Sequence, residues 1–404
     1  MAKMNELYRL FAFGAELKDP RRDHLKKHSL LNIMTISVCA MLAGAEDWTD
    51  MAGFGQNYHE WFRQLLEMPH GPPSHDTIRR VFSLLDKDSF AESLSQWLQR
   101  LRVCPRSGEA QEIGQVAIDG KKLKGSFDQA GLTQPWLMVN AYATEQGLVL
   151  GQQGARGETG ELLALHDLLD RLDVKGRLVS LDALGCQKDI AGKIVEKQGD
   201  YLLSLKANHP TLEQAARQRL AERLQGDGDD ERQDRDHAVQ WEKSHGRQTL
   251  RRCVVLRQLE GLPGIDQWLK VKAVVLVATG QDRPVRRQNA TSPARKQTQG
   301  IRLFLTSRDA SAQEYLQAVR NHWLVENQVH WSLDVTFGED ASRLRKDHGP
   351  SNLATLRRVT LSLLKADTTK ASIKLKRKLA AWNPDKLFQY LGLASGNQLK
   401  DRDK

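Results

Sequence analysis

Apolar and polar positions over residues 1–112 follow a helical period. Residues 25–44 and 58–68 place apolar side chains three and four positions apart, which predicts helices that each bury one face. Residues 74–85 begin with a Pro-Pro-Ser start signal and continue in the same period. The pattern therefore predicts a helical N-terminal domain.

After residue 113 the pattern changes to short apolar runs that alternate with helical stretches. The predicted strands are 115–120, 136–142, 148–151, 177–182 and 200–206, and the predicted helices are 161–172, 189–198 and 211–224. Three strands followed by alternating helix and strand are typical of an α/β fold, so a mixed sheet is expected.

The last predicted elements are strand-rich and end in a long helix. They are a charged loop at 226–236, strands at 250–259, 268–277 and 301–306, and a helix at 311–333. Residues 281–300 contain almost no apolar residue, and this predicts a long mobile loop before the last strand.

The net charge of +10 is confined to the end of the chain. Residues 341–404 contain 15 basic and 5 acidic residues, so the first 340 residues are neutral overall. The excess begins with Arg343, Arg345 and Lys346 and continues through Arg357 and Arg358. Such asymmetry indicates an anionic polymer partner, most simply nucleic acid, and a solvated basic tail is the alternative.

Composition excludes several classes of protein. A hydrophobic content of 40% is too high for a disordered chain. The most apolar stretch, residues 30–45, is too short and too polar for a membrane span and lies too far from the start for a signal peptide. The four cysteines form no CxxC pair, so neither a zinc finger nor a disulfide framework is expected. We expect a soluble cytoplasmic protein.

Two aspartates, Asp119 and Asp182, each end a predicted strand. Catalytic groups of open α/β sheets gather just beyond strand ends, so neighbouring strands would bring the two carboxylates together. Two like charges a few ångströms apart are unfavourable unless a proton or a metal ion lies between them. For either residue alone, a turn or a helix cap remains the alternative.

The predicted helix at 311–333 contributes a third carboxylate. Glu326 falls on the same stripe as Tyr315, Trp323 and His330, so it needs a cation if that stripe is buried. Arg320 is a candidate partner in the core. Two aspartates and a glutamate can instead hold two Mg²⁺ ions, the arrangement that catalyses phosphodiester chemistry.

Several segments resemble the DDE insertion-sequence transposases, specifically the H-repeat-associated subgroup. Ala-Ile-Asp-Gly-Lys at 117–121 is one of them, and the resemblance runs in order from about residue 19 to residue 378. The other matching segments are 43–48, 75–78, 182–191, 201–208, 242–247 and 320–335.

The resemblance implies an RNase H-like core of the α/β class whose DDE triad is Asp119, Asp182 and Glu326, with two Mg²⁺ or Mn²⁺ ions. Related transposases carry a tyrosine three residues before the arginine and a lysine seven residues after the glutamate. Here Tyr315 lies five residues before Arg320, and Leu333 stands at the lysine position. The rival third ligands are Asp334, Glu339 and Asp340.

The resemblance also divides the chain. The expected parts are a helical DNA-binding domain at 1–112, the core at 113–226 and 301–348, a strand-rich insertion at 227–300 and a basic helical region at 349–404. DNA-binding candidates are the basic residues of these parts: Arg79, Arg80, Lys206, His245, Arg247, Arg320, Arg343, Arg345 and Lys346.

The expected function is to bind the terminal inverted repeats of double-stranded DNA and then to cleave and transfer a DNA strand. The protein is expected to act as a homodimer and not to bind a membrane. Two alternatives stay open. One is an RNase H-like nuclease that cuts without joining, and the other is a domesticated copy that binds DNA without catalysis.

Overall fold

The computed structural model describes residues 17–103, 114–127, 134–226, 234–244, 247–285 and 294–392. Contacts divide the chain into two compact units. The first unit consists of Met1–Glu112, Gly120–Leu168 and Val325–Lys404, and the second consists of Ile113–Asp119 and Leu169–Leu324. The boundary falls inside strand β1, so that strand contributes residues to both units.

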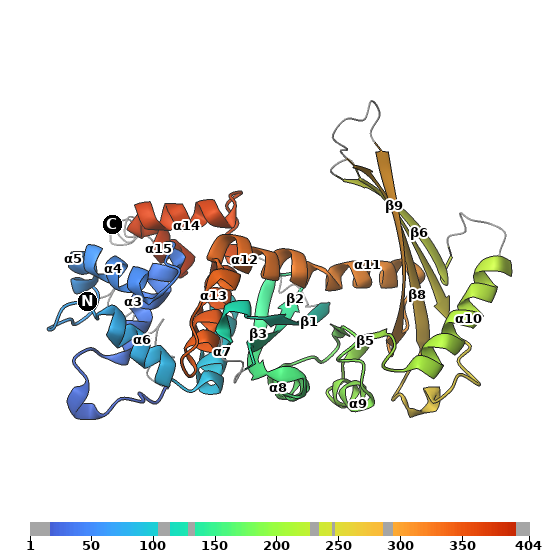
Figure 1. Cartoon of the computed structure of the whole chain (residues 1–404), viewed down its shortest axis with the longest axis horizontal. Helices are drawn as coiled ribbons and strands as arrows, with labels where there is room; N and C mark the ends of the chain where they lie inside the picture. The colour runs from blue at the N-terminus through green and yellow to red at the C-terminus, as the bar shows by residue number, and fades with distance from the viewer. Residues whose placement is uncertain are drawn as a thin grey trace, which may run out of the picture. The chain divides into compact units, whose positions relative to one another are not determined.

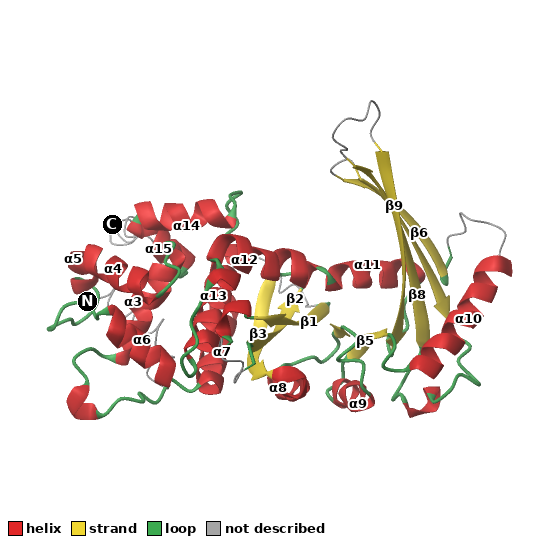
Figure 2. Ribbon diagram, viewed as in Figure 1, coloured by secondary structure: helices red, strands yellow, loops and turns green. Residues whose placement is uncertain are grey.

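The strands join in one mixed sheet with the order β3-β2-β1-β4-β5-β9-β8-β7-β6 (Figures 1 and 2). They are β1 (Gln115–Lys122), β2 (Trp136–Ala143), β3 (Leu148–Arg156), β4 (Leu178–Leu181), β5 (Asp200–Leu205), β6 (His237–Ser244), β7 (Arg247–Leu256), β8 (Ala273–Val285) and β9 (Ala294–Thr306). β1, β4 and β5 run parallel, and the pairs β2–β3, β5–β9, β9–β8, β8–β7 and β7–β6 are antiparallel. The expected α/β class with a mixed sheet is confirmed.

The predicted mobile loop at 281–300 is wrong over most of its length. β8 and β9 pair from Ala273 with Thr306 out to Val285 with Ala294. The ladder between antiparallel strands is made by backbone groups, so it does not require the apolar residues that this segment lacks. The last strand accordingly starts at residue 294 and not at residue 301.

The α-helices are α3 (Leu30–Leu42), α4 (Trp48–Asn57), α5 (His59–Arg63), α6 (His75–Leu84), α7 (Lys87–Val103), α8 (Gly157–Arg171), α9 (Lys188–Glu196), α10 (Pro210–Gly226), α11 (Ala312–His322), α12 (Trp331–Phe337), α13 (Gly349–Ala366), α14 (Ile373–Trp382) and α15 (Pro384–Tyr390). Short 3₁₀ turns are η1 (Asp23–Leu25), η2 (Lys124–Ser126), η3 (Ile265–Gln267) and η5 (Glu339–Ala341). A π-helix, η4, spans Val325–His330.

The first unit is built around two helices from opposite ends of the chain. α3 begins at the N-cap Ser29 and is buried at every position except Leu31. α13 is buried from Gly349 to Leu364 and contacts α3, α6, α7 and β3 (Figure 1). The apolar stretch in α3 is therefore a core helix, since a 13-residue helix is about 20 Å long. In the part of the chain described, no helix is long and apolar enough to span a bilayer.

Burial of α13 corrects the expectation for the basic C-terminal region. Arg357 and Arg358 lie inside the first unit, as do Lys376 and Arg377 of α14. Arg377 donates to the carbonyl oxygens of Met41 and Ala45. These cations satisfy buried acceptors, so they do not form the DNA-facing stripe that the charge count suggested.

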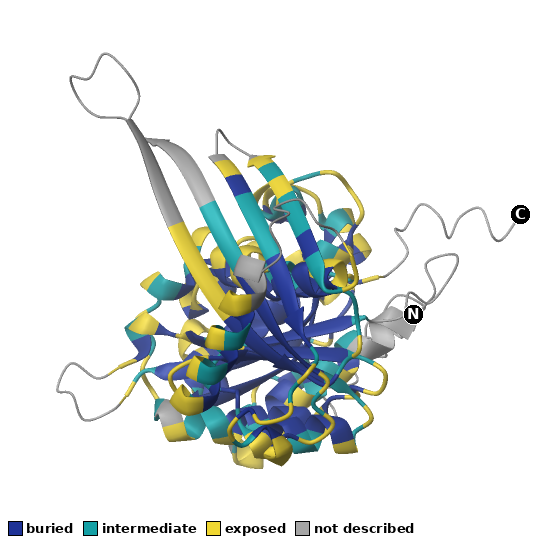
Figure 3. Ribbon diagram, turned by 90° about the vertical axis from the view of Figure 1, so that its right-hand side faces the viewer, coloured by how far each residue is buried: buried dark blue, intermediate teal, exposed yellow. Residues whose placement is uncertain are grey.

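The second unit packs α11 against the face of the sheet formed by β6 to β9. Tyr315, Leu316 and Val319 of α11 share a buried cluster with Cys253, Val275 and Phe304. Figure 3 shows the interior of the sheet as buried. The β4–α9–β5 segment belongs to the same unit, and its two strands are parallel, so they end at the same edge of the sheet.

Candidate active site

The first two carboxylates directly follow the paired part of two adjacent parallel strands. Ile118 of β1 pairs with Leu181 of β4, so Asp119 and Asp182 are the next residues on each strand. β4 ends at Leu181 as predicted, but β1 continues to Lys122, so Asp119 lies within its strand and not at its end. Asp119 is half-buried and Asp182 is exposed.

Backbone donors hold the Asp182 side chain. Its Oδ1 accepts from the amides of Leu184 at 3.1 Å and Gly185 at 3.4 Å. This is the turn that an aspartate makes with the residues directly after it, and it leaves Oδ2 without a hydrogen-bond partner among the described residues. The turn and the strand end together aim an exposed carboxylate away from the sheet.

Behind Asp182 lies a buried histidine that the sequence analysis did not single out. His322, the last residue of α11, places Nδ1 3.1 Å from Oγ of Ser180, and that oxygen accepts from Nε2 of Gln115 at 2.9 Å. Burial lowers the pKa of His322 to about 4, although the charge of Asp182 acts in the opposite direction. The ring is therefore neutral at pH 7.

The third carboxylate, Glu326, stands on η4 in the first unit. The predicted helix at 311–333 is interrupted, because α11 ends at His322 and the chain continues as a π-helix. The wider turn rotates the following residues out of the α-helical stripe, so the side chain of Glu326 is 57% exposed and not buried. Single π-turns inside helices are frequent at functional sites.

The alternative interpretation, in which Glu326 pairs with Arg320 in the core, is not supported. Arg320 instead forms an ion pair with Glu242 of β6. Glu326 accepts from Nδ1 of His330 at 2.7 Å. Burial lowers the pKa of His330, and its hydrogen bond to Glu326 opposes that effect.

The rival ligands named from the sequence all have cationic partners in the first unit. Lys121 lies 2.8 Å from Asp334 and 3.4 Å from Asp340. Glu339 is fully buried against Arg358 at 2.7 Å. Burial acts against ionisation of Asp340, but hydrogen bonds from Lys124 and Lys121 lower its pKa overall. These carboxylates are already neutralised, and Glu326 is not.

Among the residues described, three acidic and histidine side chains can each offer a ligand atom to a metal ion. They are Asp119 of β1 in the second unit, and Glu326 and His330 of η4 in the first unit. Carboxylate oxygens are the ligands that Mg²⁺ and Mn²⁺ prefer, so the two carboxylates fit a divalent cation.

The predicted DNA contacts divide by environment. Lys206 is exposed and follows β5, which pairs in parallel with β4, so it lies at the same sheet edge as Asp182. Arg343, Arg345 and Lys346 are exposed between η5 and α13. The guanidinium of Arg345 lies 5.9 Å from the centre of the Phe127 ring.

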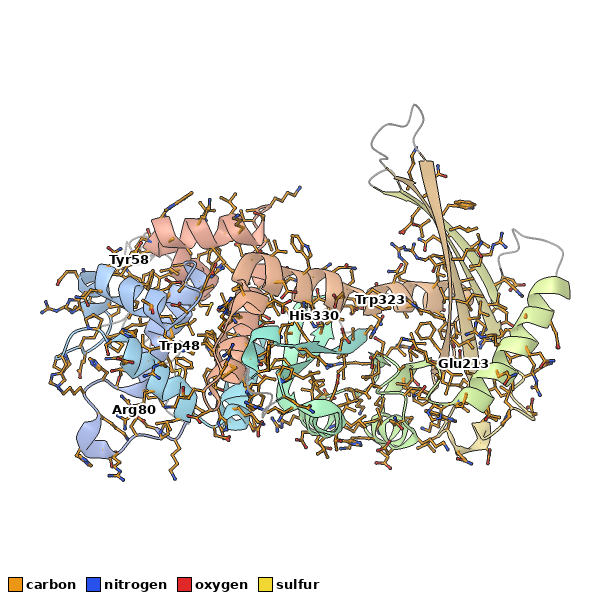
Figure 4. All side chains as sticks on the ribbon, viewed as in Figure 1. Trp48, Tyr58, Arg80, Glu213, Trp323 and His330 are labelled. Atoms are coloured by element: carbon orange, nitrogen blue, oxygen red, sulfur yellow. The ribbon has the colours of Figure 1, made fainter. Side chains whose placement is uncertain are left out.

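The remaining residues predicted to bind DNA differ in their surroundings. Arg79 of α6 pairs with Asp76 at 2.8 Å, and Arg80 beside it is exposed (Figure 4). Arg247 is the first residue of β7, whereas His245 lies outside the described residues. Arg320 is tied to Glu242, as described above.

Comparison with known proteins decides the family. The model of the family described as "Transposase DDE domain" matches residues 110–363, and that of the family described as "DDE_Tnp_1-associated" matches residues 12–98. The chain belongs to the DDE transposase family. It is an enzyme of the class that acts on DNA, and the family implies binding of DNA and use of a divalent metal ion.

Relatives of this transposase cover almost its whole length. It is 33% identical to "Putative transposase YncI" of Escherichia coli O157:H7 over 93% of this chain and 92% of that protein. It is 30% identical to "H repeat-associated putative transposase YhhI" of Escherichia coli K12 over 96% and 98%. The resemblance to the H-repeat-associated subgroup is thereby confirmed. The "Inactive transposase YbfQ" of the same strain is 35% identical over 19% of this chain and 93% of that protein.

Proposed function

We propose that this transposase binds the terminal inverted repeats of its own element as a homodimer, cleaves the DNA strand at each end and joins the freed end to target DNA. In this proposal Asp119, Asp182 and Glu326 hold two Mg²⁺ or Mn²⁺ ions. The enzyme acts in the cytoplasm, at the nucleoid.

The observation that carries the proposal is the pairing of Ile118 with Leu181 in adjacent parallel strands, because Asp119 and Asp182 are the next residues on the two strands. Two carboxylates at one strand edge repel each other unless a cation lies between them. In this proposal Glu326 adds the third carboxylate, and its side chain is more than half exposed. Divalent ions at such a set activate the attacking oxygen and stabilise the leaving oxygen of a phosphodiester.

The chain's own residues would bind and orient the DNA around these carboxylates. Lys206 follows the strand next to that of Asp182, so it is placed to contact a phosphate beside the scissile bond. Arg343, Arg345 and Lys346 are exposed cations on the unit that carries Glu326, and they are suited to contact the DNA backbone. Arg80 would contact DNA from α6.

The test is incubation of the protein with inverted-repeat DNA and Mg²⁺, with cleavage positions read on both strands. We expect Asp119→Ala and Asp182→Asn to abolish cleavage while salt-dependent DNA binding remains measurable. The matched control is Asp266→Asn, an exposed aspartate of η3 in the same unit as Asp182, which should cleave normally. Full cleavage by Asp182→Asn would refute the assignment.

A second assay separates the proposal from its alternatives. A pre-cleaved end with a free 3′-OH should be joined to target DNA by a transposase. A nuclease would cut without joining, and a domesticated copy would bind DNA in a salt-dependent manner without Mg²⁺-dependent cleavage.

A further inference from the structure

A chain of hydrogen bonds runs through the interior of the first unit and ends on Glu326. Arg358 of α13 binds Glu339 at 2.7 Å and donates through Nε to Oδ1 of Asn140 on β2. Nδ2 of Asn140 lies 3.4 Å from Nε2 of His330, and Nδ1 of His330 lies 2.7 Å from Oε2 of Glu326. His330 is labelled in Figure 4. Every member except Glu326 is buried.

The arginine sets the direction of every bond in this chain. A guanidinium can only donate, so the Asn140 atom that faces Arg358 must be the carbonyl oxygen. The amide nitrogen of Asn140 then donates its two hydrogens, one to the carbonyl of Met138 at 2.9 Å and one towards Nε2 of His330. Nε2 therefore accepts, and the proton of the neutral ring stands on Nδ1 and is donated to Glu326.

Both ring nitrogens of His330 are thus engaged. A metal ion bound by His330 would need the lone pair of one nitrogen, but Nδ1 carries the proton and the lone pair of Nε2 points at Asn140. His330 and Glu326 of the first unit could each offer a ligand atom to a metal ion. The hydrogen bonds of His330 indicate a different role for this residue.

We propose that His330 is a positioning residue for the Glu326 carboxylate and not a metal ligand. It fixes Oε2 of an exposed side chain that would otherwise sample several rotamers, and it leaves Oε1 directed outward for a cation. Asn140 and Arg358 lock the tautomer and orientation of the ring. This inference rests on the proposed function, because it takes Glu326 as a ligand of the divalent ion.

The experiment measures Mn²⁺ binding to the full-length protein without DNA, by calorimetry or by the electron paramagnetic resonance signal of the free ion. His330→Phe keeps a ring of similar size and removes the donor, and we expect its Mn²⁺ affinity to fall about tenfold. His330→Asn places an amide nitrogen near the position of Nδ1, so we expect affinity within about threefold of the natural protein. The control is His348→Asn in the same unit, whose ring contacts the carbonyl of Leu85 at 2.9 Å, and it should bind Mn²⁺ normally.

Each outcome has a separate meaning. Equal loss of Mn²⁺ binding in His330→Asn and His330→Phe would show that the imidazole is itself a ligand, and it would overturn the inference. Unchanged binding in His330→Phe would also overturn it. If Glu326→Gln leaves both Mn²⁺ binding and DNA cleavage unchanged, the proposed function fails instead, because Glu326 is then not a ligand.

A second measurement determines the tautomer of His330 in the natural protein. Nitrogen-15 NMR of the histidine side chains distinguishes a protonated Nδ1 from a protonated Nε2. We expect His330 to be neutral with its proton on Nδ1, and a proton on Nε2 would contradict the inference. The signal is assigned by its absence from the spectrum of His330→Asn.

Discussion

Replacement of Arg358 by alanine tests whether the arginines of the C-terminal region belong to the protein core. The side chains of Arg358 and Glu339 are both 0% exposed, and the guanidinium donates to the carboxylate at 2.7 and 3.3 Å. Arg358→Ala leaves a buried carboxylate without its cation, which costs about 3–5 kcal/mol of stability. An exposed ion pair would cost only about 0–1 kcal/mol.

The double variant Arg358→Met with Glu339→Leu separates the charge from the packing. It removes both ions and keeps most of the buried volume, so the main remaining cost is the unpaired Oδ1 of Asn140, about 1–3 kcal/mol. We therefore expect the double variant to be more stable than Arg358→Ala alone. Hydrogen exchange at the amides of α13 measures the opening free energy of that helix without assuming that the whole chain unfolds in one step.

Two results would refute this reasoning. One is a loss below about 1 kcal/mol in Arg358→Ala, which is the range of a solvent-exposed pair. The other is a change in the salt dependence of DNA binding in the double variant. Each phosphate contact contributes about 1 to the slope of log affinity against log salt, so a changed slope would mean that Arg358 contacts DNA. Arg345→Ala should lower that slope by about 1, and the double variant should not change it.

Two further predictions concern the stability of the folded protein, one at His322 in the second unit and one at Gly125 in the first. The pKa of His322 is about 4 in the folded protein and near 6.5 when unfolded, so the stability that its neutral ring contributes is present above about pH 6.5 and is lost as the pH falls towards 4. Urea unfolding at pH 7 and pH 4 should show a loss of roughly 3 kcal/mol from this group, and His322→Gln should lack that part. Gly125→Ala should destabilise the first unit by about 1–3 kcal/mol, because its Cβ would overlap the backbone carbonyl of Ser342. Gly53→Ala, on an open face of α4, should instead stabilise by about 0.5–1 kcal/mol in thermal unfolding.

The controls for these predictions are internal. A pH dependence of equal size in His322→Gln would mean that other groups account for it. Equal effects at Gly125 and Gly53 would mean that the contact with Ser342 does not constrain the chain.

The strand-end aspartates were predictable because their signal is local. A short apolar run that stops at Asp119, and another that stops at Asp182, indicate the two strands and the point where their parallel pairing stops, although β1 itself continues to Lys122. The surroundings of Glu326 were not predictable in this way. Helical periodicity assumes 3.6 residues per turn, and the interruption after His322 with the π-helix breaks that assumption.

Charge counts failed for a different reason. Arg343 and Arg358 contribute equally to the net charge, but one is exposed and the other is fully buried against an acid that lies 19 positions earlier. Composition cannot separate these cases, because the partner is chosen by tertiary packing. His330 carried a usable signal, since a histidine four positions after a candidate ligand can reach it on a helix.

Burial of α13 among the N-terminal helices has a consequence for protein synthesis. α3 ends at residue 42 and α13 begins at residue 349, so the helix that completes the core of the first unit leaves the ribosome long after the helices that need it. At roughly 5–20 residues per second this interval is about 15–60 s. During that time the apolar faces of α3 and α6 lack their partner, and the nascent chain depends on chaperones or on provisional contacts. An unfinished chain therefore cannot present the completed first unit to DNA.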